Sequence, residues 1–362
     1  MARTDRLRGA GGRLVYGAEA FGRADAAGLD RGDDPGDGRG LLASGLRDAG
    51  DRPRHRLPGL GGHRRGGRGA RRRALARRGA DAAPHRERGA DPRRDRRPQG
   101  RGLSGVAGRD DLGACAELVR RGDPDRFRAA MAARPSARGV LFPLYAFNLE
   151  VARAPWVVSE PMLAEIRLQW WREALEEIAE GQPARRHEVV QPLARALDAE
   201  GARLLDTLVA ARRADLERAP FADEAALWDY LDATAGTLHW VAARALGAAE
   251  EDVVRAAGQA QGLAAWLSAV PELEARGRLP LPDGRGEAVA RLAKEGLGRL
   301  GQARKRRAAV SREARAALID LAGSAAILAR AAAAPARVAE GRLAPNPLRE
   351  RLALIAAASG RW

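Results

Sequence analysis

Residues 160–180 read EPMLAEIRLQWWREALEEIAE, and this stretch indicates the fold class of the chain. Its proline at position 161 suits the first turn of a helix, where no intrahelical N–H bond is lost. Apolar side chains then recur every fourth residue along one helical face, at Ile166, Trp170, Ala174 and Ile178. The sequence Gly-Gln-Pro at 181–183 ends the pattern. The stretch therefore predicts an amphipathic helix.

Similar signals continue on both sides of this helix. Asp123-Pro124 predicts an N-cap and a first helical residue, opening a helix through Phe127 and Met131. Pro135-Ser136 interrupts that helix, and Ser136 is expected to cap a following helix that runs to about Ala152. Further helices are expected near 187–200, 202–218, 223–246, 250–276, 286–309, 311–334 and 346–358.

Alternating β-branched runs, the signature of strands, are absent from the sequence. We therefore predict an all-α fold for residues 111–362, a single bundle of roughly ten helices around one core. No run approaches the roughly 18 apolar residues of a membrane span. The single cysteine, Cys115, excludes an internal disulfide and fits a reducing compartment.

The net charge of +16 is concentrated in the first third of the chain. Residues 1–110 contain 27 Arg, 24 Gly and 14 acidic residues, which leaves only +3 for the other 252 residues. A segment so poor in bulky apolar side chains cannot offset the entropy cost of folding, so we expect a disordered extension over 1–110. Because the body is nearly neutral, the high pI does not by itself indicate a nucleic-acid partner.

Three interpretations of the extension 1–110 remain open. It could bind nucleic acid through patches such as Arg71-Arg72-Arg73. A targeting peptide is less compatible, because such peptides are poor in acidic residues. The preferred interpretation is a start codon assigned too far upstream, because 61 Arg against 2 Lys indicates a GC-rich gene.

Several short motifs of the body occur in a recognisable order. They are Leu144-Tyr145-Ala146-Phe147-Asn148, Arg167-Leu168-Gln169-Trp170-Trp171-Arg172, Tyr230 with Ala235-Gly236-Thr237, Gly258-x-Ala260, Gly277-Arg278 and Leu281-Pro282. In this order and spacing, about residues 112–358 resemble the trans-isoprenyl diphosphate synthases of the squalene/phytoene synthase family. The resemblance implies an isoprenoid-synthase-like helical bundle around a central cavity.

The enzymes of that family join two prenyl diphosphates and need Mg²⁺ to neutralise the departing diphosphate. Aspartates one turn apart on two facing helices bind the Mg²⁺ ions. The corresponding positions here are Ala152, Arg153 and Trp156 on one helix, and Ala269 and Leu273 on the other. The resemblance therefore implies that these positions are degenerate, with no catalytic residue and no metal site. Arg153 would also repel Mg²⁺ if it faced the cavity.

The neighbouring polar positions have changed as well. Gly262 stands where the family usually has Gln, Ala265 where it has Asn, and Pro280 where it has Tyr. We expect a hydrophobic cavity, for which the lining candidates are Tyr145, Phe147, Trp156, Arg167, Trp171, Tyr230, Trp266 and Arg278, together with Leu273. Core packing is the alternative for the tryptophans, and a packed or surface position is expected for His187 and His239.

Residues 148–150 and 159–161, Asn-Leu-Glu and Ser-Glu-Pro, resemble one branch of the family more closely. That branch contains the mitochondrial assembly factor for respiratory complex I and its bacterial phytoene-synthase-like relatives. It implies a non-catalytic protein without a cofactor, which binds a membrane-associated protein subunit or an apolar isoprenoid-like ligand. The expected location is the bacterial cytoplasm, with peripheral contact at the inner membrane.

Two other functions stay open from the sequence. The first is an active prenyltransferase of isoprenoid or carotenoid biosynthesis, which would require Mg²⁺. The second is nucleic-acid binding through the basic N-terminal segment.

Overall fold

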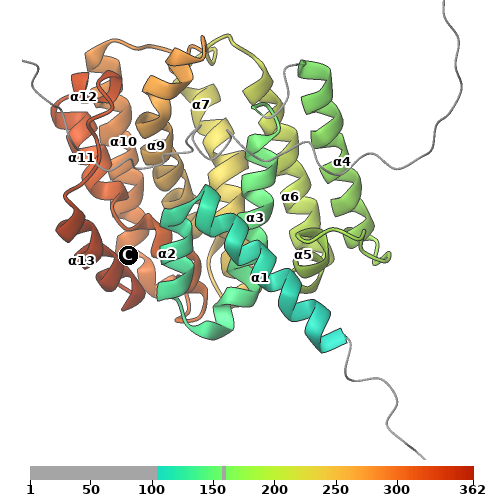
Figure 1. Cartoon of the computed structure of the whole chain (residues 1–362). Helices are drawn as coiled ribbons and strands as arrows, with labels where there is room; N and C mark the ends of the chain where they lie inside the picture. Colours follow the sequence, from blue (N-terminus) through green and yellow to red (C-terminus); the bar gives the residue numbers. More distant parts are fainter. Residues whose placement is uncertain (1–103, 157–159) are drawn as a thin grey trace, which may run out of the picture. The chain divides into compact units, whose positions relative to one another are not determined.

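The computed structural model describes residues 104–156 and 160–362, and side chains from residue 111 onward. This part of the chain is helical throughout and contains no strand, only one isolated bridge between Ala249 and Val310 (Figure 1). The all-α prediction is confirmed. The extension predicted over 1–110 lies outside the described residues, except for 104–110, which form the start of the first helix.

The helices differ in length and are joined by short turns. In chain order they are α1 (Ser104–Gly122), α2 (Pro124–Ala132), α3 (Arg138–Arg153), α4 (Pro161–Ala179), α5 (Val190–Ala196), α6 (Ala199–Ala211), α7 (Glu224–Leu231), α8 (Thr237–Leu246), α9 (Glu251–Ala275), α10 (Gly286–Lys305), α11 (Ser324–Ala333), α12 (Ala336–Ala339) and α13 (Pro347–Ala358). Shorter 3₁₀ segments are η2 (Pro135–Ala137), η3 (Arg212–Leu216), η5 (Arg307–Ala309) and η6 (Ala314–Leu321), and η4 (Asp232–Gly236) is a π-helix.

Several of the predicted helices are divided in the structure, among them 187–200, which is interrupted between α5 and α6. The predicted helix 223–246 consists of α7, the π-helical turn η4 and α8. The predicted helix 311–334 consists of η6 and α11, which are separated at Gly323, a residue with a left-handed φ of 93°. Periodicity runs through the last two of these breaks, because each pair of segments buries its apolar side in the same core.

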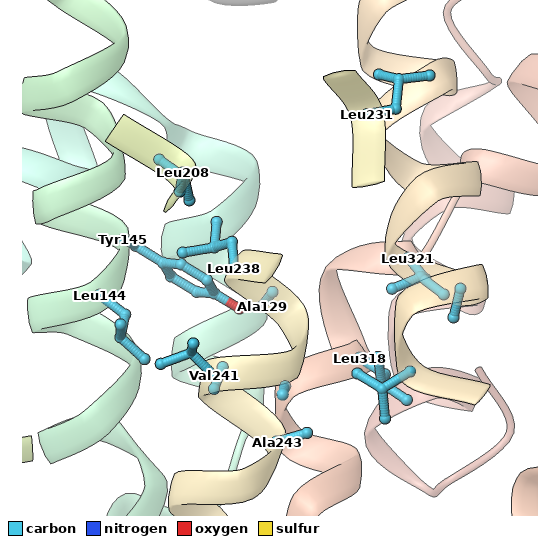
Figure 2. Close-up of a cluster of buried hydrophobic side chains, with 14 of the residues drawn as sticks. Ala129, Leu144, Tyr145, Leu208, Leu231, Leu238, Val241, Ala243, Leu318 and Leu321 are labelled. Atoms are coloured by element: carbon cyan, nitrogen blue, oxygen red, sulfur yellow. The ribbon is translucent and has the colours of Figure 1, made fainter. Parts of the chain in front are cut away.

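Helix α8 lies between the two halves of the bundle. It contacts α3 and α6 on one side and α9 and η6 on the other. Figure 2 shows this core, to which α3 contributes Leu144 and Tyr145, α8 contributes Leu238 and Val241, and η6 contributes Leu318. The longest helix, α9, also packs against α10, α11 and η4, so it is central to the second half.

The buried side of α4 differs from the predicted face. Ile166 is 57% exposed, and Trp170 and Ile178 are only partly buried. The side chains that reach the interior are Ala164, Leu168, Trp171, Ala174 and Leu175. The reason is that α4 lies at the edge of the bundle and packs mainly on α6, so its neighbours determine which of two apolar stripes is covered.

One predicted cap is confirmed and one is wrong. The carboxylate of Asp123 accepts a bond from the backbone N–H of Arg126 at 3.0 Å, as the sequence Asp-Pro predicted. Ser136 does not cap α3, because it lies inside the 3₁₀ turn η2, which leads directly into that helix.

Residues Ala314–Ala333 form the one stretch of the described chain that is long and apolar enough to cross a membrane by composition. In the structure this stretch is interrupted at Gly323. Its two parts pack against α8, α9 and α10, so they belong to the core of the bundle.

A buried ionic chain connects η6, α8 and α2. The carboxylate of Asp320 accepts from Nε2 of His239 at 2.9 Å and from Nε of Arg126 at 3.2 Å. Nδ1 of His239 lies 2.7 Å from the carbonyl oxygen of Ala235, which can only accept a hydrogen bond. Both ring nitrogens of His239 therefore lie within hydrogen-bond distance of an oxygen. Burial alone would raise the pKa of Asp320, but His239 and Arg126 outweigh it and lower that pKa.

We predict that Asp320→Asn lowers the free energy of unfolding by about 3–5 kcal/mol, because it removes the buried carboxylate that Arg126 and His239 share. Urea unfolding followed by circular dichroism measures this change. Asp252→Asn is the matched control, since its ion pair with Arg306 is exposed and its loss should leave the midpoint nearly unchanged. Equal midpoints for the two variants would contradict the assigned role of Asp320.

The ionic chain also predicts acid sensitivity. Because the pKa of Asp320 is lowered on folding, its stabilisation is complete above the unfolded value of about 3.9 and is lost as the pH falls through the folded pKa. The free energy of unfolding, measured at decreasing pH, should therefore fall less steeply for Asp320→Asn than for the unmodified chain. Parallel curves for the two proteins would contradict this prediction.

Candidate functional site

A cavity of about 90 Å³ lies between α3, the α7–η4 segment and α9. Its apolar lining comes from Ala152, Trp156, Leu231, Ala235, Leu238, Gly262, Ala265, Trp266, Ala269 and Leu273. Its polar lining comes from Arg126, Asn148, Arg212, Asp215, Tyr230, Thr234, Gln261 and Arg278. The cavity is therefore apolar on one side and charged on the other, so it carries more charged side chains than the expected hydrophobic cavity.

Four of the degenerate positions meet in this cavity. Ala152 and Trp156 face it from the end of α3, and Ala269 and Leu273 face it from α9. Arg153 does not line the cavity and lies 3.4 Å from the Glu150 carboxylate instead. Among the side chains that the structure describes, no three His, Cys, Asp or Glu residues are grouped so that they could bind a metal ion.

Aromatic side chains occupy much of the apolar side. The Trp156 ring stacks under the guanidinium of Arg276, 4.8 Å from its centroid, and so connects the end of α3 to the end of α9. The indole N–H of Trp266 donates to the carbonyl oxygen of Pro280 at 2.8 Å. The same ring lies edge-on to Tyr230 at 5.3 Å. These contacts hold the two indoles in place rather than leave room for a ligand.

The charged side is a compact cluster around Asp215. Its carboxylate accepts from the Tyr230 hydroxyl at 2.8 Å, from Arg278 at 3.1 Å and from Arg212 at 3.2 Å. Arg212 also donates to the Tyr230 hydroxyl at 2.8 Å. Arg278 is held further by the carbonyl oxygen of Ala214 at 2.9 Å. Burial raises the pKa of the Tyr230 hydroxyl, so this group remains a neutral donor.

One carboxylate thus serves two guanidinium groups, that of Arg278, which is buried, and that of Arg212, which is partly buried, and the local charge is positive. A cluster of this sign cannot attract Mg²⁺, because a cation would be repelled in a poorly solvated site. The carboxylate that remains in the cavity is already shared by Arg212 and Arg278. The residues present therefore do not fit a magnesium site.

The small volume of the cavity follows from close helix packing. A Cβ atom on Gly262 would lie 2.6 Å from the Cβ of Ala235, and one on Gly258 would lie 2.9 Å from the Ala235 carbonyl oxygen. The two glycines, one turn apart on α9, allow the π-helical turn η4 to approach that helix closely. Pockets that bind small molecules usually have about 300–1,000 Å³, several times this volume.

The structure separates the predicted lining residues into two groups. Trp156, Tyr230, Trp266 and Arg278 line the cavity, as does Leu273. The other candidates lie elsewhere, namely Tyr145, Phe147, Trp171 and Arg167.

Each of the displaced candidates has a clear position in the fold. Tyr145 points into the core, where Arg126 lies over its ring at 5.5 Å (Figure 2). Phe147 packs edge-on against Trp171 at 5.2 Å, on the side of α3 that faces α4. Arg167 is exposed on the outer side of α4. They differ from the lining residues because successive residues of a helix point in different directions.

Both histidines are packed side chains, as expected. His187 lies between the rings of Trp170 and Trp171 at 5.2 and 5.4 Å, and His239 belongs to the buried ionic chain.

Sequence reasoning missed Arg212, Asp215 and Arg126. Arg212 and Asp215 are one turn apart within a predicted helix, a spacing that usually indicates a solvent-exposed ion pair. Their role could have been inferred only from Arg278, which lies beside Asp215 in space. That proximity depends on the turn after α9 and is not visible in the sequence.

The sequence profile described as squalene/phytoene synthase matches residues 119–337 of the chain. Two curated relatives are named NADH dehydrogenase (ubiquinone) complex I, assembly factor 6. The protein from Bos taurus is 28% identical over 198 residues, covering 51% of this chain and 55% of the relative. The protein from Homo sapiens is 27% identical over 191 residues, covering 51% and 57%. The chain therefore spans about half the length of these relatives.

Two solved structures have a similar fold. A dehydrosqualene synthase in complex with ligand superposes with a TM-score of 0.55 and 15% identity, over 70% of this chain and 97% of the other. The squalene synthase HpnC from Alicyclobacillus acidocaldarius gives a TM-score of 0.52 and 18% identity, over 62% and 94%. These similarities show a shared isoprenoid-synthase-like fold.

We predict that Gly262→Ala destabilises the protein by about 1–3 kcal/mol, because its methyl group would overlap Ala235 and force η4 away from α9. Gly298→Ala in α10 is the matched control, since a Cβ atom there meets nothing within 4 Å. That control should stabilise by about 0.5–1 kcal/mol through helix propensity. Thermal unfolding of both variants measures the difference, and similar shifts would show that α9 and η4 are not in tight contact.

Proposed function

The chain belongs to the squalene/phytoene synthase family, and from this membership we propose that it retains the family's helical scaffold without its prenyl-transfer chemistry. The observation that supports the proposal most strongly is that no carboxylate stands at the positions where the family resemblance leads us to expect metal-binding aspartates. Ala152, Trp156, Ala269 and Leu273 face one another across the cavity, and none can bind Mg²⁺. Without the metal ion, the charge of a departing diphosphate is not neutralised.

The charged side of the cavity supports the same proposal. Arg212 and Arg278 could attract a diphosphate, but both already bind Asp215. The apolar side is filled by Trp156 and Trp266, and about 90 Å³ is too little for two prenyl chains. No cofactor is therefore expected.

We further propose that the protein assists the assembly of a respiratory complex. The support is its similarity to proteins named complex I assembly factor 6. The partner would be a membrane-associated protein subunit rather than an apolar isoprenoid-like ligand, because the cavity is too small for such a ligand. The expected location is the bacterial cytoplasm, peripheral to the inner membrane.

The enzyme alternative is tested directly. The purified full chain is incubated with farnesyl or geranylgeranyl diphosphate and Mg²⁺, and pyrophosphate release and condensed products are measured. We expect neither, because the described lining of the cavity contains one carboxylate, Asp215, and no pair that could bind the metal. Metal-dependent formation of a condensed product would contradict the non-catalytic proposal.

The assembly role is tested by deleting the gene in its host. We expect the amount of assembled NADH dehydrogenase complex, seen on native gels, to fall and to recover when the chain is expressed again. Isoprenoid and carotenoid levels should stay unchanged in the same cells. Loss of these lipids with intact complex would favour the prenyltransferase alternative.

Restoring the aspartates should not restore activity. In a variant with Ala152→Asp, Trp156→Asp, Ala269→Asp and Leu273→Asp, we expect no turnover, since the polar neighbours at 262, 265 and 280 are also lost. Calorimetric Mg²⁺ titration together with the product assay distinguishes a missing metal site from missing chemistry. Turnover in this variant would show that the residues at these four positions alone distinguish the unmodified chain from an active enzyme.

A further inference from the structure

The C-terminal helix α13 presents an apolar stripe to the outside. Leu348, Leu352 and Ile355 are 68%, 65% and 66% exposed. Their spacing of four and three residues places them on one side of the helix. Large apolar side chains that are exposed in a contiguous row usually mark a contact surface, unlike apolar residues scattered singly.

The opposite side of α13 is already used for packing. Ala357 is buried, Leu354 packs against the core, and the helix contacts α2 and η6. A helix that is apolar on both sides requires an apolar environment on both sides. The exposure of the stripe shows that the described residues supply that environment only on the inner side.

The charges around the stripe have one sign. Arg349 and Arg351 are exposed, and their positions on the helix place them on its two sides. The only acidic residue of α13, Glu350, binds Arg128 at 3.3 Å and has 19% of its side chain exposed. The outer surface of α13 therefore combines apolar side chains with positive charge.

We propose that α13 binds the surface of an anionic lipid bilayer. Leu348, Leu352 and Ile355 enter the boundary between headgroups and acyl chains, while Arg349 and Arg351 contact phosphate groups. Charge complementarity favours a bilayer over a protein partner, because basic residues lie on both sides of a narrow apolar row that contains no aromatic residue. This inference rests on the proposed function, since it gives that function its contact with the membrane.

The test measures binding of the full chain to vesicles by sedimentation. Vesicles of phosphatidylcholine alone are compared with vesicles that also contain phosphatidylglycerol. The variant Leu348→Ser, Leu352→Ser and Ile355→Ser should reduce binding to the anionic vesicles about tenfold or more. Because these side chains are exposed, the thermal midpoint should not fall, and its measurement confirms that the variant is folded.

A matched control is available on α4. Met162, Leu163 and Ile166 are also exposed, and changing all three to Ser removes a similar apolar area where the charges are mixed, with Glu160, Glu165 and Arg167 nearby. This control should bind vesicles like the unmodified chain. The variant Arg349→Gln and Arg351→Gln should lose about tenfold in binding to anionic vesicles and little in binding to neutral ones.

A label reports insertion directly. Cys115 is fully buried, and burial raises the pKa of its thiol to about 12, so it will not compete for a thiol-reactive dye. A polarity-sensitive dye on Leu352→Cys should shift to the blue with anionic vesicles, and the same dye on Met162→Cys should not. Equal shifts, or none, would overturn the proposal.

Two other outcomes would also overturn it. If the α13 variant binds vesicles as strongly as the unmodified chain does, the binding is due to another part of the chain, such as the 27 arginines of residues 1–110. If the variant instead separates a dimer in light scattering, the stripe is a contact between copies. Vesicle binding requires no respiratory complex, so normal binding together with normal complex levels in the gene deletion would refute the proposed function and leave this inference intact.

Discussion

The carboxylate of Asp320 connects parts of the bundle that are far apart in the sequence. It binds Arg126 of α2 and His239 of α8, and Asp320 itself lies in η6. All three groups are buried, and their shared contacts hold the three segments in one relative position. Arg126 also pairs with Asp123 at 3.2 Å. Arg126 is also part of the cavity wall, so the ionic chain fixes one side of the candidate site.

The opposite wall depends on a short distance between helices. Gly258 and Gly262 allow η4 to lie directly against α9, and the cavity between them is correspondingly small. The enzymes of this family accommodate two long substrates. In this chain, the close approach of η4 to α9 leaves a cavity of only about 90 Å³. The indoles of Trp156 and Trp266 and the cluster around Asp215 use the space for internal contacts.

Most of the helices follow from local signals. The cap at Asp123, the proline at position 161 and the long apolar pattern of α9 all appear where the sequence indicates them. The exceptions are segments whose sequence is compatible with more than one way of packing. Residues 164–175 offer two apolar stripes, and only the position of α6 selects the one that is buried. The breaks at η4 and Gly323 also depend on packing, since the periodicity continues through them.

By itself, the amino-acid sequence determined the all-α class, and it shows that Ala152, Trp156, Ala269 and Leu273 carry no carboxylate, because periodicity and residue identity are local properties. Only the tertiary structure decided that Arg212 and Asp215 face Arg278, that Tyr145 and Phe147 belong to the core, and that no described residue covers the stripe on α13. The physical reason is that burial depends on what packs against a helix. A single helix has the same sequence pattern whether a neighbour, a cavity or solvent lies beside it.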